Sequence, residues 1–348
     1  MKFKNVCIES IAHFLPEESV TSEAIEKRLS SVYDRLNLSI GRLELMTGIK
    51  ERRFWEHGTS PSLASSMVGK IAIEESGIDK EKIGCLIHSA VCRDFLEPAT
   101  ASVVHEKLKL NEDVMLFDLS NACLGFLNAM VIVGNMIENG VIKAGLIVAG
   151  ETGRPLVDTT IENMLNDKAL TRKSIKSSLA SLTIGSGAAA ALLVHSSISR
   201  KKHYLLGGEI IASTGFNNLC KGGALARSDS ASKPLMNTDA ETLLNAGCEL
   251  AKRTWKKVKM SLDISEQKVD HYFCHQVGSA HRKLLFDTLE LDITKEYSTF
   301  GYLGNVGSVS LPATFSIGIE KRSLKKDDLV ILMGIGSGIN CMILAVKW

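Results

Sequence analysis

An internal repeat is the feature of this chain that most constrains its fold. Residues 82–110 (KIGCLIHSAVCRDFLEPATASVVHEKLKL) and 268–291 (KVDHYFCHQVGSAHRKLLFDTLEL) each have the pattern of an apolar strand, a loop and an amphipathic helix. Downstream, each half has an asparagine that opens a small-residue segment and, after the same interval, a glycine that closes an apolar strand. These residues are Asn121 and Gly150 in the first half, and Asn305 and Gly334 in the second. The repeat predicts a fold made of two similar halves.

The pattern of the elements predicts the fold class. The strands are apolar along their length and alternate with helices, which is typical of an α/β fold with parallel strands covered on both faces. With 348 residues, the chain also exceeds the size at which a single hydrophobic core usually stops growing. We place the halves at residues 1–196 and 197–348, with the boundary in the polar stretch HSSISRKKH. Ligands of such sheets bind at the carboxyl ends of strands, in the crevice between equivalent loops.

Composition excludes several classes of function. A net charge of +2 argues against a nucleic-acid partner bound over the whole surface. The N-terminal residues MKFKNVCIESIAHFLPEE lack the sustained apolar core of a signal peptide, and no run of 18 apolar residues indicates a membrane span. The eight cysteines form no CxxC pairs, so they indicate neither a metal site nor a disulfide framework. We therefore expect a cytoplasmic protein without a metal.

Cys123 occupies a special place in the segment FDLSNACLGFLNAM. An apolar strand at 114–118 precedes it, and a helix with Gly140 as its stop signal follows. At the first turn of a helix, unpaired N–H groups and the dipole favour a thiolate, so a nucleophile would be placed there. The alternative interpretation is that Cys123 is packed as a small apolar residue, which is the commoner role of cysteine.

His275 and Asn305 lie in loops comparable with the loop of Cys123, because each of the three segments follows a strand. A single histidine in a loop is usually a surface residue, but three such groups at equivalent positions of a repeat indicate a site. A thiolate can accept an acyl group, and imidazole and amide N–H groups can stabilise the enolate or oxyanion that forms when a thioester carbonyl is attacked. The three residues therefore predict acyl transfer followed by condensation.

Two other interpretations of these motifs are weaker. Papain-like proteases also use Cys, His and Asn in this order, but their signature C-G-[SA]-C-[WY] is absent and Cys123 lies deep in the chain. The glycine runs at 184–191 and 334–340 suggest nucleotide binding. The second run leaves no room for the helix and strand of a dinucleotide fold, and the first precedes a strand. We interpret both runs as tight turns.

Over its whole length the chain resembles the thiolase-superfamily condensing enzymes of the ketoacyl synthase III type. The motifs that carry the resemblance are DLSNACLGF around Cys123, CHQV around His275, GNVGSVSLP around Asn305, LTIGSGAAA, and GIGSGIN around Ser337. The resemblance implies a five-layered αβαβα fold, an obligate homodimer, and acyl transfer from a coenzyme A thioester to Cys123, with no permanently bound cofactor. It assigns His275 and Asn305 to the condensation, and the oxyanion hole to the backbone amides of Cys123 and Ser337.

Some positions depart from the usual ketoacyl synthase III pattern. RLELM (42–46) stands where that group carries a Trp and an Arg for the adenine of coenzyme A, and Gly278 and Ala280 replace an Asn and an Arg. The residues that bind coenzyme A are therefore not assigned. Closer similarity is found with the head-to-head acyl-CoA condensing enzymes of bacterial olefin synthesis, through the motifs CRDFLEPATAS, NNLCKGG and GIGSGINC and the terminal Trp348.

This closer resemblance implies a role for Glu97. The joining of two fatty acyl-CoAs to a 2-alkyl-3-oxoacyl product without loss of CO₂ requires a base for a weakly acidic α-proton, whereas decarboxylation needs none. In the family this loop reaches the acyl pocket of the other subunit, so Glu97 of the partner subunit is expected to be the general base. The alternative role is structural, because an acid ahead of Pro98 can stabilise the start of the next helix.

Two other functions use the same fold. One is decarboxylative extension of an acyl group with malonyl-acyl carrier protein, and the other is a catalytically silent partner subunit, which the retention of Cys, His and Asn argues against. The basic segment LAKRTWKKVK (250–259) is either a solvated helix end or a docking patch for an acidic carrier protein or coenzyme A phosphates.

Overall fold

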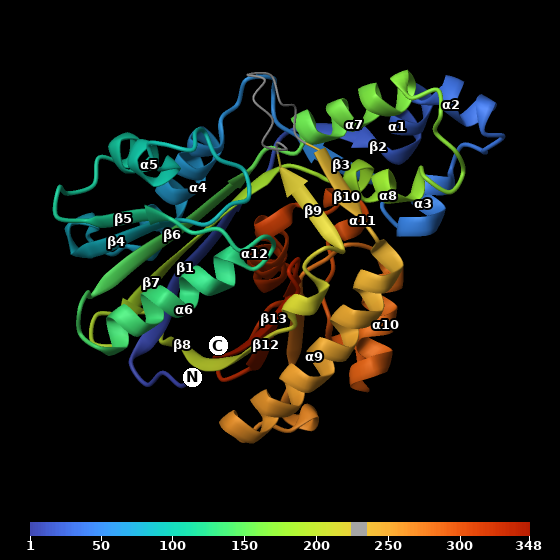
Figure 1. Ribbon diagram of the computed structural model, residues 1–348. Coiled ribbons are helices and arrows are strands. Elements are labelled where there is room, and N and C mark those ends of the chain that lie inside the picture. Colours follow the sequence, from blue (N-terminus) through green and yellow to red (C-terminus); the bar gives the residue numbers. More distant parts are fainter. Residues whose placement is uncertain (224–234) are drawn as a thin grey trace.

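The computed structural model describes residues 1–223 and 235–348 (Figure 1). Strands from both halves form one continuous series that contains parallel and antiparallel pairs. Nine of the described strands are hydrogen-bonded in the order β11-β12-β13-β8-β1-β7-β6-β4-β5. They are β1 (Val6–Phe14), β4 (Ile83–His88), β5 (Met115–Asp118), β6 (Ala144–Glu151), β7 (Gly187–His195), β8 (His203–Ala212), β11 (His271–Cys274), β12 (Leu329–Gly336) and β13 (Asn340–Lys347). Strand β1 meets β8 through two residue pairs, Cys7 with Tyr204 and Ile8 with His203. This narrow junction divides the strands into two sheets.

The two sheets have the same strand order on either side of the junction. Outward from it, the first sheet has β1, β7, β6 and β4, and the second has β8, β13, β12 and β11. The first sheet ends with β5 parallel to β4, and the second ends with a parallel bridge between Tyr272 of β11 and Glu296. The repeat in the sequence therefore corresponds to a repeat of structure. The division at residues 196 and 197 falls between β7 and β8 and stays an interpretation of the sequence.

The expectation of parallel strands is only partly correct. Parallel pairing joins β4 to β5, β4 to β6 and β11 to β12, but β1, β7, β8 and β13 pair antiparallel with their neighbours. Strand β6 is buried at every residue although it is antiparallel to β7. Helices cover both faces of each sheet whatever the strand direction, so an apolar run predicts burial and not direction.

The described helices form three layers around and between the two sheets and a separate group beside them. They are α1 (Ser22–Arg28), α2 (Ser30–Arg35), α3 (Arg42–Thr47), α4 (Pro61–Ser76), α5 (Thr100–Leu108), α6 (Gly125–Glu138), α7 (Arg154–Asn166), α8 (Lys176–Leu179), α9 (Ala240–Leu262), α10 (Ser279–Leu289), α11 (Phe300–Leu303) and α12 (Ser310–Arg322). Helices α4 and α5 cover the first sheet, α6 and α12 lie between the sheets, and α9 and α10 cover the second (Figure 1). The fold is thus thiolase-like, with the layer order αβαβα.

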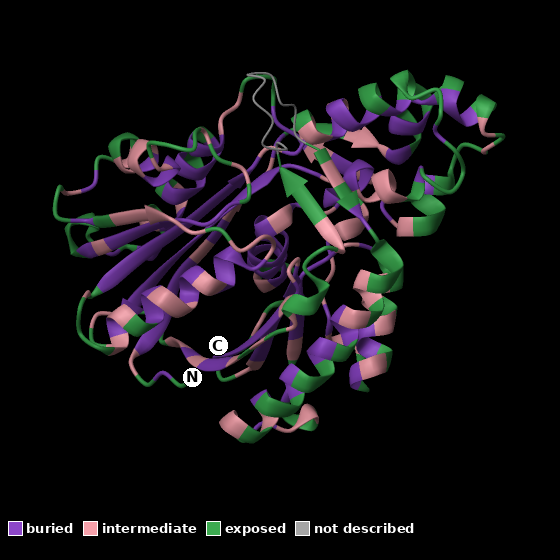
Figure 2. Cartoon of the chain, in the orientation of Figure 1, coloured by how far each residue is buried: buried purple, intermediate pink, exposed green. Residues whose placement is uncertain are grey.

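The buried apolar side chains gather in the spaces between these layers. The central core contains Phe126 of α6, Phe273 of β11 and Phe315 of α12, and separate cores lie beneath α4 and beneath α9. Figure 2 shows inner strands of the sheets, such as β6 and β7, almost wholly buried, and many exposed residues on the outer helices. A fourth core joins α1, α2 and α7. Beside it lies the small ribbon of β2 (Glu18–Thr21) and β3 (Glu51–Phe54). Within the described ranges, no helix is both long and apolar enough to cross a membrane.

Candidate active site

Cys123 lies in the tight turn that joins β5 to α6. Ala122 has a φ of 46°, a left-handed conformation that residues with a side chain rarely adopt. The backbone N–H of Leu124 donates to the carbonyl of Asn121 at 2.9 Å. Helix α6 begins at Gly125, where a Cβ atom would lie 2.5 Å from the carbonyl oxygen of Ser89. The predicted strand-to-helix turn is therefore present, and it depends on a glycine at the helix start.

The predicted preference of Cys123 for the thiolate is wrong. Burial raises the pKa of the Cys123 thiol to about 12, and the negative charge of Glu151 acts in the same direction. A backbone N–H acts in the opposite direction but contributes least. Desolvation of the thiolate outweighs the helix start, because the anion loses more by leaving water than it gains from nearby N–H groups. The thiol is therefore protonated at neutral pH, and its proton must be removed during acyl transfer.

The end of β12 packs directly against the residue that follows Cys123. Cβ atoms at Gly334 and Gly336 would lie 2.4 Å and 3.0 Å from side-chain carbons of Leu124. The glycine run is therefore a close-approach turn between β12 and β13, as the sequence predicted, and larger residues would push it away from Cys123.

A chain of amides also connects this turn to the turn of Cys123. Asn340 Nδ2 donates to Asn121 Oδ1 at 3.4 Å and to the carbonyl oxygen of Ser337 at 3.3 Å. Asn121 Nδ2 in turn donates to Asn128 Oδ1 at 2.8 Å. The segment of Ser337, which is expected to supply one N–H of the oxyanion hole, is thus tied to the loop that precedes Cys123.

His275 directly follows β11 and extends its pairing with β12. Its backbone N–H donates to the carbonyl of Met333 at 2.8 Å. The imidazole is buried, and its Nδ1 has no hydrogen-bond partner among the described residues. Burial lowers the pKa of His275 to about 3, and His281 contributes in the same direction. The ring is therefore neutral at physiological pH and able either to accept a proton or to donate an N–H.

Asn305 is held by the turn that closes the first half of the chain. Its backbone N–H donates to the carbonyl of Thr183 at 2.9 Å, and its carbonyl accepts from Gly185 N–H at 2.9 Å. The side-chain Oδ1 accepts from the backbone N–H of Gly307 at 3.1 Å and from Ser310 Oγ at 3.5 Å. Because Oδ1 is engaged in this way, Nδ2 is the side-chain group left to donate to a substrate.

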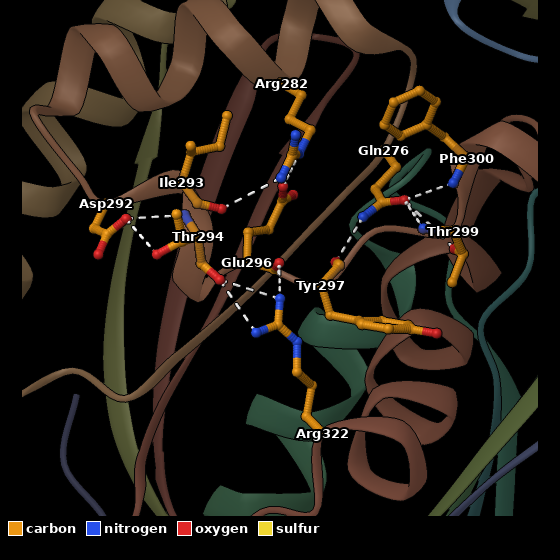
Figure 3. A network of polar contacts seen from close by, with 10 residues as sticks. All are labelled: Gln276, Arg282, Asp292, Ile293, Thr294, Glu296, Tyr297, Thr299, Phe300 and Arg322. Atoms are coloured by element: carbon orange, nitrogen blue, oxygen red, sulfur yellow. Dashed lines mark hydrogen bonds and ion pairs between the residues drawn. The ribbon is translucent and has the colours of Figure 1, made fainter.

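Gln276 connects the segment of His275 to the segment of Asn305. Its Oε1 accepts from the backbone N–H groups of Thr299 at 2.7 Å and Phe300 at 2.8 Å, where α11 begins (Figure 3). Helix α11 leads directly to Asn305. The CHQV motif places Gln276 next to His275, but nothing in the sequence pattern alone indicates this linking role.

An ion-pair network supports the same segment from its other side. Arg282 of α10 pairs with the buried carboxylate of Glu296, and Arg322 of α12 donates to the carbonyl oxygens of Thr294 at 3.1 Å and Glu296 at 2.6 Å (Figure 3). Burial raises the pKa of Glu296, and Arg282 opposes this shift. These contacts fix the chain between β11 and α11, and thereby the distance between the two loops.

Gly278 departs from the family pattern for a structural reason. Its φ is 152°, and a Cβ atom there would lie 2.8 Å from the carbonyl oxygen of Thr47 at the end of α3. No other residue fits without displacing α3. On the outer side of this helix Leu45 is 84% exposed, so the stretch 42–46 presents an apolar surface to solvent.

Glu97 lies on the surface, in the loop between β4 and α5, and not among the buried groups of the site. Its neighbour Leu96 is 94% exposed and Phe95 is 57% exposed. The first N–H groups of α5, those of Thr100 and Ala101, donate to the carboxylate of Asp118 at 2.8 Å each. The stabilising role considered for Glu97 at this helix start therefore belongs to Asp118.

The basic segment lies where the sequence analysis placed it, in the second half of α9. Lys252, Arg253, Lys256 and Lys257 are exposed, while Lys259 pairs with Glu266. The described residues contain no cluster of three or more His, Cys, Asp or Glu side chains that could hold a metal ion.

Comparisons with known proteins agree with this fold. Residues 117–213 match the family model described as 3-oxoacyl-[acyl-carrier-protein (ACP)] synthase III, and residues 260–348 match that of its C-terminal part. The chain is 40% identical to the acyl-CoA:acyl-CoA alkyltransferase of Shewanella oneidensis and 36% identical to that of Xanthomonas campestris pv. campestris, over the full length of both chains. It is 26% identical, again over the full length, to a β-ketoacyl-[acyl-carrier-protein] synthase III of Clostridium tetani.

Solved structures give the same result. The crystal structure of Xanthomonas campestris OleA with bound cerulenin has a TM-score of 0.94 and 36% identity, and covers 100% of this chain and 98% of that chain. A structure of the same enzyme with one glutamate replaced by alanine also has a TM-score of 0.94. The fold and the relatives define an acyltransferase of the thiolase-like condensing class. The chain belongs to the 3-oxoacyl-[acyl-carrier-protein] synthase III family, in the group of the acyl-CoA:acyl-CoA alkyltransferases.

Proposed function

We propose that this enzyme joins two fatty acyl-CoA molecules by a non-decarboxylative Claisen condensation, through an acyl-Cys123 intermediate, to a 2-alkyl-3-oxoacyl product. The observation that carries the proposal is the full-length similarity to two acyl-CoA:acyl-CoA alkyltransferases, because the synthase III relatives reported above are much more distant. The Cys123, His275 and Asn305 segments supply the groups that this reaction needs.

In the first step the acyl group moves from coenzyme A to Cys123. The thiol is protonated, so a base must take its proton as sulfur attacks the thioester carbon. We assign this proton to the neutral ring of His275, whose Nδ1 has no hydrogen-bond partner among the described residues and which then passes the proton to the departing coenzyme A thiolate. The backbone N–H groups of Cys123 and Ser337 would stabilise the oxyanion.

In the second step another acyl-CoA becomes the nucleophile. Glu97 of the partner subunit removes an α-proton, and N–H groups of His275 and Asn305 stabilise the enolate oxygen. The α-carbon then attacks the acyl-Cys123 carbonyl, the carbon–sulfur bond breaks, and the thiolate of Cys123 recovers the proton held by Glu97. Engagement of Asn305 Oδ1 by Gly307 supports this role, since it leaves Nδ2 to donate.

The assignment of Glu97 requires a homodimer, which we also propose. Strand β5 is the last strand of its sheet and Met115 on it is 53% exposed, so it offers an open edge to a second chain. The nearby loop exposes Val91, Phe95 and Leu96, and so large an apolar surface favours a protein interface. We place the enzyme in the cytoplasm, in keeping with its eight free cysteines.

A decarboxylative reaction with malonyl-acyl carrier protein is the second candidate. The matches to the two synthase III family models and the exposed basic face of α9 favour it. It uses Cys123, His275 and Asn305 in the same way but needs no base from the partner. A silent partner subunit is a weaker third candidate, because all three polar groups are retained.

One experiment separates these functions. The purified protein is incubated with a single long-chain acyl-CoA, with and without a malonyl donor, and products and intact protein are measured by mass spectrometry. We expect one acyl adduct, absent in Cys123→Ala, and a 2-alkyl-3-oxoacyl product without malonyl donor. An adduct that persists in Cys123→Ala would refute the assignment of the nucleophile, and a product that forms only with the malonyl donor would favour the second candidate.

A further inference from the structure

Glu151 is a buried carboxylate at the carboxyl end of β6. It is 4% exposed, and no ion pair to it is found within the described ranges. A buried charge without a counter-ion is costly unless hydrogen bonds satisfy it, so its partners indicate what it is for. None of the catalytic roles proposed above uses this residue.

Four hydrogen bonds from two loops converge on this carboxylate. Oε1 accepts from the backbone N–H of Val91 at 2.9 Å, and from the backbone N–H of Ser308 at 3.1 Å and its Oγ at 2.8 Å. Oε2 accepts from the backbone N–H of Cys92 at 3.1 Å. One side chain therefore joins two segments that are distant in sequence.

The first of these segments is the turn of Asn305. Gly307 has a φ of 54°, and a Cβ atom there would lie 2.7 Å from Glu151 Oε1, so the turn is pressed against the carboxylate. The backbone N–H of the same Gly307 donates to Asn305 Oδ1. Contact with Glu151 therefore sets the turn that determines which way the Asn305 amide faces.

The second segment begins the loop of Glu97. Glu151 holds this loop at Val91 and Cys92, and Asp118 holds its other end through the start of α5. Between the two anchors Asp94 accepts from the backbone N–H of Ser62 at 2.9 Å, and Glu97 is exposed. The carboxylate of Glu151 thus fixes the first part of this loop, at Val91 and Cys92.

We propose that Glu151 is a positioning residue of the condensation step, which orients Asn305 in its own site and anchors the loop that carries Glu97 to the other subunit. This inference rests on the proposed function. Glu151 touches neither acyl group in this role, so its loss should not slow the transfer of the first acyl group to Cys123. Its loss therefore affects the two half-reactions unequally.

The test compares Glu151→Gln with wild type in both half-reactions. Glutamine has the same shape, but its amide nitrogen meets the N–H donor of Cys92, so one of the two bonds that anchor the loop is lost. We expect adduct formation on Cys123 at no less than the wild-type rate and condensation slower on the order of 100-fold, the scale of a misplaced catalytic group. Glu9→Gln is the matched control. Glu9 is also buried and accepts from a hydroxyl and a backbone N–H, those of Ser199 and Arg200.

Two further variants test whether the position of the Glu151 carboxylate matters apart from its charge, and whether the effect is seen without a loss of folding. Glu151→Asp keeps the charge but is one methylene shorter and cannot hold both loops, so condensation should stay slow. Alkylation of Cys123 by iodoacetamide should be faster in Glu151→Gln, because the charge that raises the thiol pKa is gone, and should remain slow in Glu151→Asp. Ser308→Ala removes one bond of four, so it should fold if Glu151→Gln does not, and condensation should again fall more than acylation.

The outcomes are distinct. If Glu151→Gln and Glu9→Gln lower acylation and condensation in equal proportion, or if Ser308→Ala changes neither, Glu151 is a structural residue and the inference is wrong. If wild type itself forms no product from acyl-CoA alone, the proposed function fails. Condensation is then measured with the malonyl donor, where unequal loss in Glu151→Gln would still support positioning of Asn305.

Discussion

Asp118 Oδ2 accepts a hydrogen bond from the backbone N–H of Thr100 at 2.8 Å, and this contact from the end of β5 fixes the first turn of α5. Because Asp118 accepts from the first backbone N–H groups of α5, Glu97 is not needed as a cap of this helix. Asp118→Ala should lower the free energy of unfolding by about 1–2 kcal/mol, as expected for loss of a helix cap. Glu97→Ala should leave it unchanged. Urea denaturation measures the free energy of unfolding of both variants. An equal decrease in the two would show that Glu97 has a structural role.

The reactivity of Cys123 should depend on pH through the raised pKa of its thiol. Only the thiolate reacts with iodoacetamide, and the thiol pKa is raised to about 12. The alkylation rate of Cys123 should therefore rise steadily with pH from neutral into the alkaline range. An inflection near the ordinary pKa of cysteine, about 8.5, would instead indicate a thiol exposed to water.

Acid should destabilise the protein through four histidines whose pKa values are lowered in the folded state. Burial lowers the pKa of His275 to about 3 and the pKa values of His88, His203 and His281 to about 4. These histidines take up protons near pH 6.5 in the unfolded chain but not in the folded chain. Their contribution to the free energy of unfolding is therefore fully present above about pH 6.5 and is lost as the pH falls towards about 4. Urea unfolding across this range should show the loss, reduced in His281→Gln. If the free energy of unfolding of His281→Gln depends on pH as that of wild type does, His281 does not contribute to the loss of stability in acid.

The basic face of α9 gives a prediction about encounter with substrate. Lys256 and Lys257 are both exposed. If they attract the phosphates of coenzyme A or an acidic carrier protein, Lys256→Glu with Lys257→Glu should raise the apparent KM, and the increase should shrink at high salt. The control is the double variant Lys283→Glu with Lys321→Glu, which reverses two exposed lysines on other helices. Unchanged kinetics in both double variants would show that the α9 segment is only a solvated helix surface.

The sequence predicted those features that depend on local patterns. The strand-to-helix turn at Cys123 and the glycine turn after β12 follow from apolar periodicity and small residues, and the repeat predicted the matching order of the two sheets. Local patterns could not predict the protonated thiol of Cys123, because its main causes are burial and the charge of Glu151 on another strand. The cap from Asp118 was missed for the same reason, since it joins residues from separate elements.

The central claim is that condensation takes its base from Glu97 of the partner subunit. The neutral isostere Glu97→Gln keeps the shape of the side chain and removes its basicity, and Glu97→Ala removes both. Neither change touches the groups that load Cys123. Acyl-Cys123 should therefore form in both variants as in wild type.

The most direct measurement is the yield of 2-alkyl-3-oxoacyl product from acyl-CoA alone in wild type, Glu97→Ala and Glu97→Gln, with acylation of Cys123 recorded on the same samples by intact-protein mass spectrometry. We predict full acylation in all three proteins and product only in wild type. Condensation at the wild-type rate in either variant, or a wild type that forms product only with a malonyl donor, would contradict the non-decarboxylative account.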